Sequence, residues 1–224
     1  MATTCIPRNT ALQAVIFDMD GVIIDSHTAH RRAWKDFLKT LGRDVSENEL
    51  DCILTGRKRA DILRIFLGEL SDEQAQHYGK QKDDFFQRVA LDVKPVPGVV
   101  EFLDEMQSNR IEAAVATSAS RLRTLRTLQR LRLESYFSVV VTGDDVDLGK
   151  PDPGIYRLTC RKLGLTPDNV LVFEDAVSGV QAARQAGLRC VGVVGERTPA
   201  ELLLAAGASR LITSFIGVSL NTLC

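Results

Sequence analysis

Residues 13–22 have the sequence QAVIFDMDGV. The run begins with apolar residues, several of them β-branched or aromatic, which predicts a strand buried on both faces of a parallel sheet. The composition then changes abruptly, so Asp18 and Asp20 should lie on the loop at the carboxyl end of that strand, where open α/β sheets bind their ligands. Asp-x-Asp-Gly is also a common turn sequence. Charge at the mouth of a buried strand is costly without a partner, however, which favours a metal or phosphate site.

The composition and net charge narrow the class of protein. With 224 residues, of which 45% are hydrophobic and 25% charged, the chain can form one large domain or two modest ones. Its formal net charge of −1 gives no long-range attraction to nucleic acid or to an anionic membrane, and we expect neither as a partner. The scattered cysteines argue against a disulfide framework or a zinc site. Since we find no signal-peptide core and no apolar run of membrane length, we expect a soluble, cytoplasmic monomer.

The chain changes from strand to helical periodicity after Asp25. Apolar residues then recur at helical spacing, and residues 46–49 and 71–74 have the form of capping boxes, which begin helices. No strand signal interrupts this pattern before about residue 93. We therefore predict an all-helical cap domain at residues 27–94, inserted after the first strand.

Strand and helix signals alternate in the remainder of the chain. Strands are expected at residues 112–117, 139–142, 170–173, 190–194 and 211–213, with helices between them. Repeated βα units form a parallel sheet with helices on both faces. We predict an α/β fold with a Rossmann-like core, formed by residues 1–26 and 95–224, and with the cap domain over the carboxyl edge of its sheet. The two crossings, near residues 22–28 and 92–98, should act as a hinge.

Polar residues from several loops should meet at one edge of this sheet, because each parallel strand delivers its following loop there. Thr117 and Ser118 follow the second core strand, and hydroxyls at the start of a helix can hold a phosphate, although an ordinary helix cap has the same sequence. Lys150 lies between a glycine and a proline, so it is not expected to be an ordinary solvent-exposed charge on the surface of a helix. Glu174 and Asp175 end the fourth predicted strand.

Carboxylates gathered at one edge repel each other. A like-charged pair about 4 Å apart costs roughly 4 kcal/mol at an effective dielectric of 20, so some of the acids must be protonated or a cation must lie among them. Oxygen ligands with room for water and phosphate favour Mg²⁺ over zinc. Mg²⁺ and Lys150 together would offset the repulsion between a phosphate and an attacking carboxylate, which could then form an aspartyl phosphate.

Taken in chain order, these residues resemble the motifs of the haloacid dehalogenase-like phosphatase superfamily. The matching segments are Asp18-Met19-Asp20-Gly21-Val22, Thr117-Ser118, Lys150-Pro151 and Glu174-Asp175. The resemblance extends from about residue 13 to residue 213, and the helical segment between the first two motifs is similar to the branch that includes β-phosphoglucomutase and small sugar-phosphate phosphatases. It implies an enzyme that transfers phosphoryl groups.

The resemblance also implies a role for each motif residue. Asp18 would attack phosphorus, and Asp20 would protonate the leaving oxygen and then deprotonate the next nucleophile, with a pKa raised by the nearby phosphate. The Mg²⁺ ligands would be Asp18, the Asp20 main-chain carbonyl and Asp175, with Glu174 acting directly or through water. The phosphoryl oxygens would be held by Thr117, the Ser118 N–H and Lys150, and a cis peptide is expected before Pro151.

The cap residues allow two interpretations each. His30 and Arg59 match positions that face the site in β-phosphoglucomutase, but Arg59 could equally be a solvated charge and His30 a polar residue with local partners. The mutase also carries a Ser-Lys-Asn sequence that grips a distal phosphate, whereas residues 119–121 here are Ala-Ser-Arg. This departure favours a phosphatase over a mutase.

The prediction is a Mg²⁺-dependent phosphatase of a small phosphorylated metabolite, in the first place a sugar phosphate. β-Phosphoglucomutase, in which a sugar hydroxyl replaces water, is the second interpretation. A receiver-type phosphoacceptor domain is the third. It shares the acid cluster and a Lys-Pro, but its lysine comes last in the sequence, whereas Lys150 precedes Glu174 here.

Overall fold

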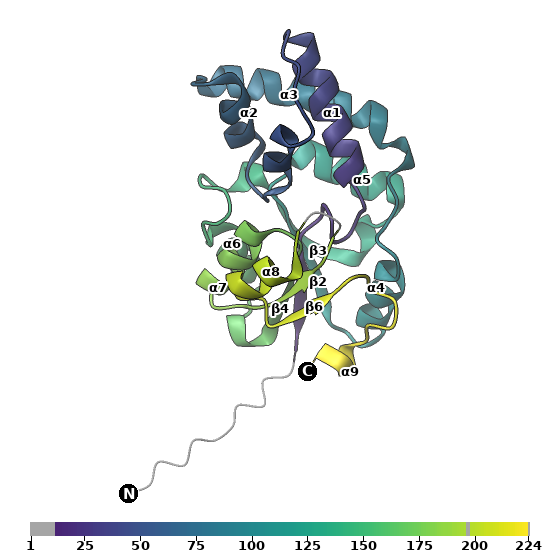
Figure 1. The fold of residues 1–224 in the computed structure, drawn as a ribbon. Coiled ribbons are helices and arrows are strands. Elements are labelled where there is room, and N and C mark those ends of the chain that lie inside the picture. The colour runs from purple at the N-terminus through teal and green to yellow at the C-terminus, as the bar shows by residue number, and fades with distance from the viewer. Residues whose placement is uncertain (1–11, 196–197, 224) are drawn as a thin grey trace, which may run out of the picture.

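The computed structural model describes residues 12–195 and 198–223, in which six parallel strands form one sheet in the order β3-β2-β1-β4-β5-β6 (Figure 1). The strands are β1 (Ala14–Phe17), β2 (Glu112–Ala116), β3 (Phe137–Val141), β4 (Val170–Glu174), β5 (Arg189–Val193) and β6 (Arg210–Ile212). The strand order reverses direction on either side of β1, which is the position where such sheets bind ligands. The predicted Rossmann-like α/β fold is confirmed.

Helices cover both faces of the sheet. On one face lie α4 (Val99–Ser108) and α5 (Arg121–Leu131), and on the other α6 (Gly154–Leu163), α7 (Val177–Gln185) and α8 (Ala200–Ala206). A further short helix, α9 (Leu220–Leu223), was not predicted. No helix in the described part of the chain has the length and apolarity needed to cross a bilayer.

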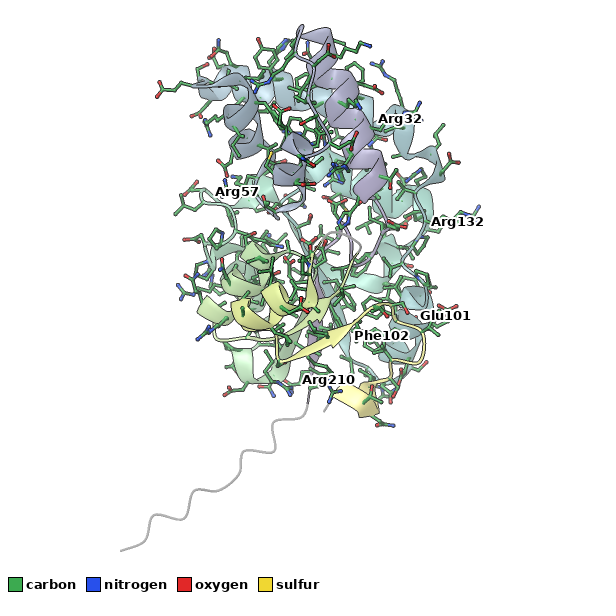
Figure 2. The ribbon with its side chains drawn as sticks, in the orientation of Figure 1. Arg32, Arg57, Glu101, Phe102, Arg132 and Arg210 are labelled. Atoms are coloured by element: carbon green, nitrogen blue, oxygen red, sulfur yellow. The ribbon has the colours of Figure 1, made fainter. Side chains whose placement is uncertain are left out.

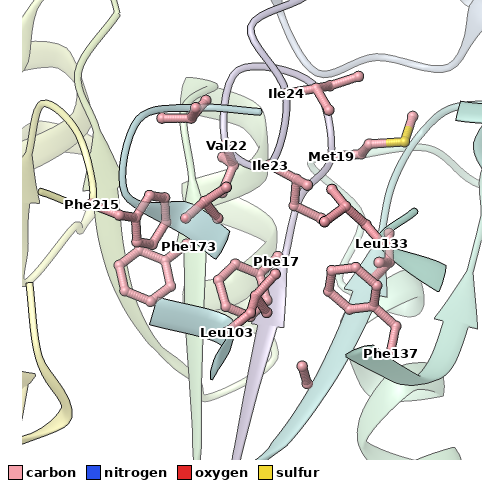
Figure 3. Close-up of a cluster of buried hydrophobic side chains, with 14 of the residues drawn as sticks. Phe17, Met19, Val22, Ile23, Ile24, Leu103, Leu133, Phe137, Phe173 and Phe215 are labelled. Atoms are coloured by element: carbon pink, nitrogen blue, oxygen red, sulfur yellow. The ribbon is translucent and has the colours of Figure 1, made fainter. Parts of the chain in front are cut away.

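Strand β1 alternates between two apolar cores, as the period of two in a strand requires. Val15 and Phe17 belong to the core under α4 and α5, and Ala14 and Ile16 to the core on the other face. The ring of Phe17 is stacked on that of Phe173, with 5.5 Å between the ring centroids (Figure 3). This central packing fixes the end of β1, after which the chain enters the loop with the two aspartates.

The helical insert, residues 27–94, lies above the carboxyl edge of the sheet (Figure 1). It contains α1 (His27–Thr40), the 3₁₀ turn η1 (Glu49–Leu54), α2 (Arg59–Leu67), α3 (Asp72–Val89) and the 3₁₀ turn η2 (Ala90–Asp92). The insert has an apolar cluster of its own around Trp34, Phe37 and Leu63. The capping box at residues 71–74 begins α3 as predicted, whereas the one at residues 46–49 precedes a 3₁₀ turn instead of an α-helix.

The two crossings between the core and the insert run side by side. Ile24 and Pro95 form an antiparallel bridge. The Asp25 N–H donates to the Lys94 carbonyl at 2.9 Å, and the Val96 N–H donates to the Ile23 carbonyl at 2.9 Å. Any movement of the insert relative to the core must therefore bend the two paired segments, residues 23–25 and 94–96, together.

Candidate active site

The ends of the parallel strands bring the predicted core residues together. Asp18 follows β1 directly, and its N–H donates to the Phe173 carbonyl of β4 at 3.0 Å, so it lies beside the end of that strand. A cavity of about 80 Å³ opens here between the core and the insert. Most of the predicted site residues line it, namely Asp18, Asp20, His30, Arg59, Thr117, Ser118 and Asp175.

Lys150 is buried beside Asp18, although it does not line the cavity. Its Nζ donates to Asp18 Oδ1 at 2.7 Å, to the Ala116 carbonyl at 3.2 Å and to Glu174 Oε1. Burial alone would lower the pKa of this ammonium, but Asp18 and Glu174 raise it above the usual value. The lysine is therefore a permanent positive charge held against one oxygen of Asp18. The Lys150–Pro151 peptide bond is cis, as the resemblance implied.

Glu174 has partners on both of its carboxylate oxygens. Oε1 accepts from Lys150 and from the Tyr156 hydroxyl at 2.9 Å, and Oε2 accepts from the Ala176 N–H at 3.0 Å. The side chain is fully buried against Gly179, where an added Cβ would lie 1.8 Å from Oε1. These contacts make Glu174 a support for Lys150, so they favour an indirect, water-mediated role toward a metal over direct ligation.

Asp18 and Asp175 form an acidic pair whose negative charge is not fully balanced by the neighbouring Lys150 and His27. Burial raises the pKa of Asp18 well above its usual value, although Lys150 opposes the increase. The charges of Glu174 and Asp175 raise it further. Burial also raises the pKa of Asp175, against the effect of His27, whose Nε2 lies 2.9 Å from Asp175 Oδ2. A divalent cation among these oxygens would relieve the repulsion, and an all-oxygen set suits Mg²⁺.

The set of side chains available to such a cation is small. Within residues 12–195 and 198–223, no group of three or more His, Cys, Asp or Glu side chains is arranged to hold a metal ion. The ligand set implied by the resemblance needs only two carboxylates, Asp18 and Asp175, with the Asp20 main-chain carbonyl as the third protein ligand. Mg²⁺ commonly keeps several waters and binds substrate phosphate, so these residues fit the ion.

The Asp20 carboxylate is surrounded by donors. Oδ1 accepts from the Ser26 hydroxyl at 2.6 Å, lies 3.1 Å from His30 Nε2 and accepts from Arg123 Nη1 at 3.0 Å, while Arg123 Nη2 donates to Oδ2. Burial would raise the pKa of Asp20, but Arg123 and His30 outweigh it and hold the pKa well below its usual value. The expectation of a raised pKa considered only a nearby phosphate, because the sequence did not reveal this guanidinium.

Thr117 and Ser118 lie at the cavity as predicted. Thr117 is buried, and its hydroxyl oxygen accepts from the Ala119 N–H at 3.2 Å. The Ser118 hydroxyl donates to the Gly56 carbonyl at 2.6 Å, across the boundary between the core and the insert. The Ser118 side chain therefore links the core to the insert. The binding of phosphate by the Ser118 main-chain N–H stays a prediction.

Arg59 is half-buried and forms an ion pair. Its guanidinium pairs with Asp83 of α3, which also accepts from the Ser120 hydroxyl at 2.7 Å. Asp83 thus joins two helices of the insert to the core. Arg59 and Asp83, paired in this way, both line the cavity. Arg57, nearby where the insert faces the core, lines the cavity as an exposed residue (Figure 2).

Two buried cations at the site, Lys82 and Arg123, were not predicted. Their side chains are only 3% and 5% exposed, and both line the cavity. Lys82 occupies the buried face of α3, between Gly79 and Phe86, so its helical spacing was a usable signal. Arg123 lies on the buried face of α5 beside Thr127. A charged residue within an apolar helical stripe is the pattern that would have identified Lys82, whereas threonines accompany Arg123 on its face and give no such signal.

Comparison with known proteins shows similarity along almost the whole chain. A family model described as haloacid dehalogenase-like hydrolase matches residues 15–193. The phosphorylated carbohydrates phosphatase of Thermotoga maritima is 39% identical over 204 residues, which cover 90% of this chain and 94% of that protein. The fructose-1-phosphate phosphatase YqaB of Escherichia coli is 33% identical over 182 residues, covering 80% and 95%. The crystal structure of CbbY from Rhodobacter sphaeroides in complex with phosphate superposes with a TM-score of 0.82 at 29% identity, covering 91% and 95%.

Proposed function

Because this chain belongs to the haloacid dehalogenase-like hydrolase family, we propose that it is a Mg²⁺-dependent phosphatase of a small phosphorylated metabolite, in the first place a sugar phosphate. Its similarity to these relatives supports a phosphoric monoester hydrolase or a phosphotransferase. The observation that carries the proposal is the contact of Lys150 with one oxygen of Asp18, at 2.7 Å, beside a cavity that this aspartate lines. The contact orients the carboxylate and leaves its other oxygen for phosphorus.

The cation would be held by the Asp18 and Asp175 carboxylates and the Asp20 main-chain carbonyl. When bound, it would neutralise charge on the phosphoryl group and allow the anion to approach a carboxylate. The negative charges of Glu174 and Asp175 repel that of Asp18 in a buried site. Lys150 alone does not offset burial and this repulsion, since the pKa of Asp18 remains raised. This imbalance supports the dependence on a metal.

The reaction would proceed in two displacements at phosphorus. A carboxylate oxygen of Asp18 forms a bond to phosphorus as the bond to the leaving oxygen breaks. Asp20 gives that oxygen a proton, which it must first take up from solvent against the effect of Arg123 and His30; the negative charge of the bound phosphate would favour this uptake. Asp20 then takes a proton from a water that attacks the aspartyl phosphate, which releases phosphate and restores Asp18. Thr117, the Ser118 N–H and Lys150 would hold the oxygens of the transferred group throughout.

The size and charge of the cavity support a small anionic substrate. Its volume is about 80 Å³, and basic side chains border it on the side of the insert. These are Arg57, Arg59, Lys82 and Arg123. Two of the relatives described above are named for phosphorylated carbohydrates and fructose 1-phosphate. A sugar phosphate combines the hydroxyls and the charge that such a lining can bind.

The test is phosphate release from a panel of phosphorylated metabolites, with p-nitrophenyl phosphate as the general substrate. Turnover should require Mg²⁺, stop with EDTA and be lost in Asp18→Asn. Stoichiometric phosphorylation of Asp18 without release of phosphate would show an acceptor protein instead. Turnover that survives Asp18→Asn would refute the assigned nucleophile.

The buried cation Lys82 keeps the mutase as a second candidate, because it could hold the second phosphate of a sugar bisphosphate. Arg59 is already engaged by Asp83, which weakens this interpretation. Incubation with β-glucose 1-phosphate and a trace of bisphosphate separates the two. A phosphatase releases free phosphate, whereas a mutase yields glucose 6-phosphate without it.

A further inference from the structure

Arg123 lies outside the four motifs, yet its guanidinium reaches the centre of the site. It projects from the buried face of α5 and is 5% exposed. Nη1 donates to Asp20 Oδ1 at 3.0 Å and Nη2 donates to Oδ2, so the contact is bidentate. Bidentate pairs between arginine and carboxylate fix geometry as well as charge.

The other donors to Asp20 reach one of its two oxygens. The Ser26 hydroxyl and His30 Nε2 both contact Oδ1. Turning about the Cβ–Cγ bond is then resisted at one oxygen only. Among the hydrogen bonds of the described residues, those of Arg123 reach both oxygens, and they therefore fix the plane of the carboxylate.

The insert supports this guanidinium from the other side. The Arg123 Cζ atom lies 5.0 Å from the centroid of the Phe86 ring, and the His30 ring is stacked on the same ring at 4.3 Å. Phe86 belongs to α3 and is fully buried. Two of the donors to Asp20 thus pack against one aromatic residue of the insert, so their arrangement depends on the position of the insert relative to the core.

Proton transfer demands this kind of placement. A general acid must meet the leaving oxygen at hydrogen-bond distance, and small errors in its orientation are costly. We propose that Arg123 is a positioning residue, which fixes the plane of the Asp20 carboxylate for proton transfer when Phe86 packs against it in the closed enzyme. The inference rests on the proposed phosphatase function, and it concerns how Asp20 is held, since Arg123 itself need not touch the substrate.

The first experiment compares Arg123→Met with Arg126→Met. Arg126 lies one turn further along α5 and is exposed, so its substitution removes the same charge outside the site. With p-nitrophenyl phosphate and Mg²⁺, kcat of Arg123→Met should fall about 10- to 100-fold, within the range that general acid–base catalysis contributes. KM should stay the same, and Arg126→Met should behave as the wild type. An unchanged kcat, or a change confined to KM, would overturn the proposal.

The second experiment uses Arg123→Lys, which keeps the charge but cannot bind both oxygens. Its kcat should also fall, with KM unchanged. A wild-type kcat would show that charge alone suffices and would overturn the positioning role. If thermal melting shows that Arg123→Met does not fold, Arg123→Lys carries the test. Failure of the proposed function is recognised separately, because the wild type would then show no turnover.

Discussion

Lys82 fixes the tautomer of His30. The Lys82 Nζ lies 3.3 Å from His30 Nδ1, and an ammonium can only donate, so Nδ1 accepts and the proton of the ring resides on Nε2. That nitrogen lies 3.1 Å from Asp20 Oδ1 and donates to it. Burial and the charge of Lys82 lower the pKa of His30 to about 3. His30 therefore gives Asp20 a directed hydrogen bond while remaining uncharged.

Replacing Lys82 by methionine should stabilise the protein at neutral pH and weaken substrate binding. Burial lowers the pKa of Lys82 from 10.5 to about 8, so below pH 8 the folded state contains a buried charge that is poorly compensated. We expect the free energy of unfolding of Lys82→Met to exceed that of the wild type at pH 7 by about 1–4 kcal/mol. Urea denaturation measures the difference, and Lys80→Met, an exposed position of α3, is the control.

The increase in the free energy of unfolding caused by Lys82→Met should become smaller as the pH rises from about 8 to 10.5. Between these values the unfolded wild-type chain binds the Lys82 proton and the folded state does not, so the stability of the wild type increases with pH. The two denaturation curves should therefore converge in alkaline buffer. A difference that stays constant from pH 7 to pH 10 would contradict the assigned burial cost.

Asp18→Asn should lose activity without losing stability. The substitution removes the nucleophile, and we expect turnover to fall by at least about 1000-fold, as for other catalytic nucleophiles. The raised pKa of Asp18 shows that its charge is unfavourable in the folded state, so a neutral side chain of the same shape should not lower the melting temperature. Calorimetry checks this, and a large drop in melting temperature would mean that the carboxylate is chiefly structural.

Mg²⁺ should raise the melting temperature of the wild type. The ion would bind the folded acidic pair and relieve its repulsion, and a ligand at 100 times its Kd stabilises a protein by about 2.7 kcal/mol. Asp175→Asn should abolish the increase, whereas Glu101→Gln, on the outer surface of α4, should keep it (Figure 2). An equal increase in Asp175→Asn would place the ion elsewhere.

Gly179→Ala should lower both stability and turnover. Its Cβ would lie 1.8 Å from Glu174 Oε1, so the carboxylate that holds Lys150 must shift. Overpacking of this kind costs about 1–3 kcal/mol. Gln181→Ala, an exposed position of the same helix, provides the control. Denaturation and kcat should change together, and a variant with normal kcat would show that Lys150 does not depend on Glu174.

The fold could be predicted from the sequence because its signals are local. Strand β1 shows an uninterrupted apolar run that ends in charge, and the helix ends at Gly68 and Gly164 carry the glycines that left-handed or otherwise positive φ values require. Helix α9 was missed because four residues are too few to display a period. The capping box at residues 46–49 is present, but a cap does not determine whether an α-helix or a 3₁₀ turn follows.

The candidate site could be predicted only in part. Its core residues follow strands, and parallel topology brings such residues together. The environment of Asp20 depends on Arg123, which is 103 positions away in the sequence, and no local pattern joins the two. Likewise, the Tyr156 hydroxyl and the Ala176 N–H become partners of Glu174 only once the sheet and helices have packed.

The bridge between Ile24 and Pro95 has a consequence for evolution and engineering. The insert leaves and re-enters the core at adjacent points, with the Asp25 N–H hydrogen-bonded to the Lys94 carbonyl. A segment anchored in this way is a cassette, which can be exchanged for the corresponding segment of a relative without lengthening either connection. A chimaera joined at these two residues keeps the loops of the sheet, but its new segment must supply a partner for Asp20 in place of His30.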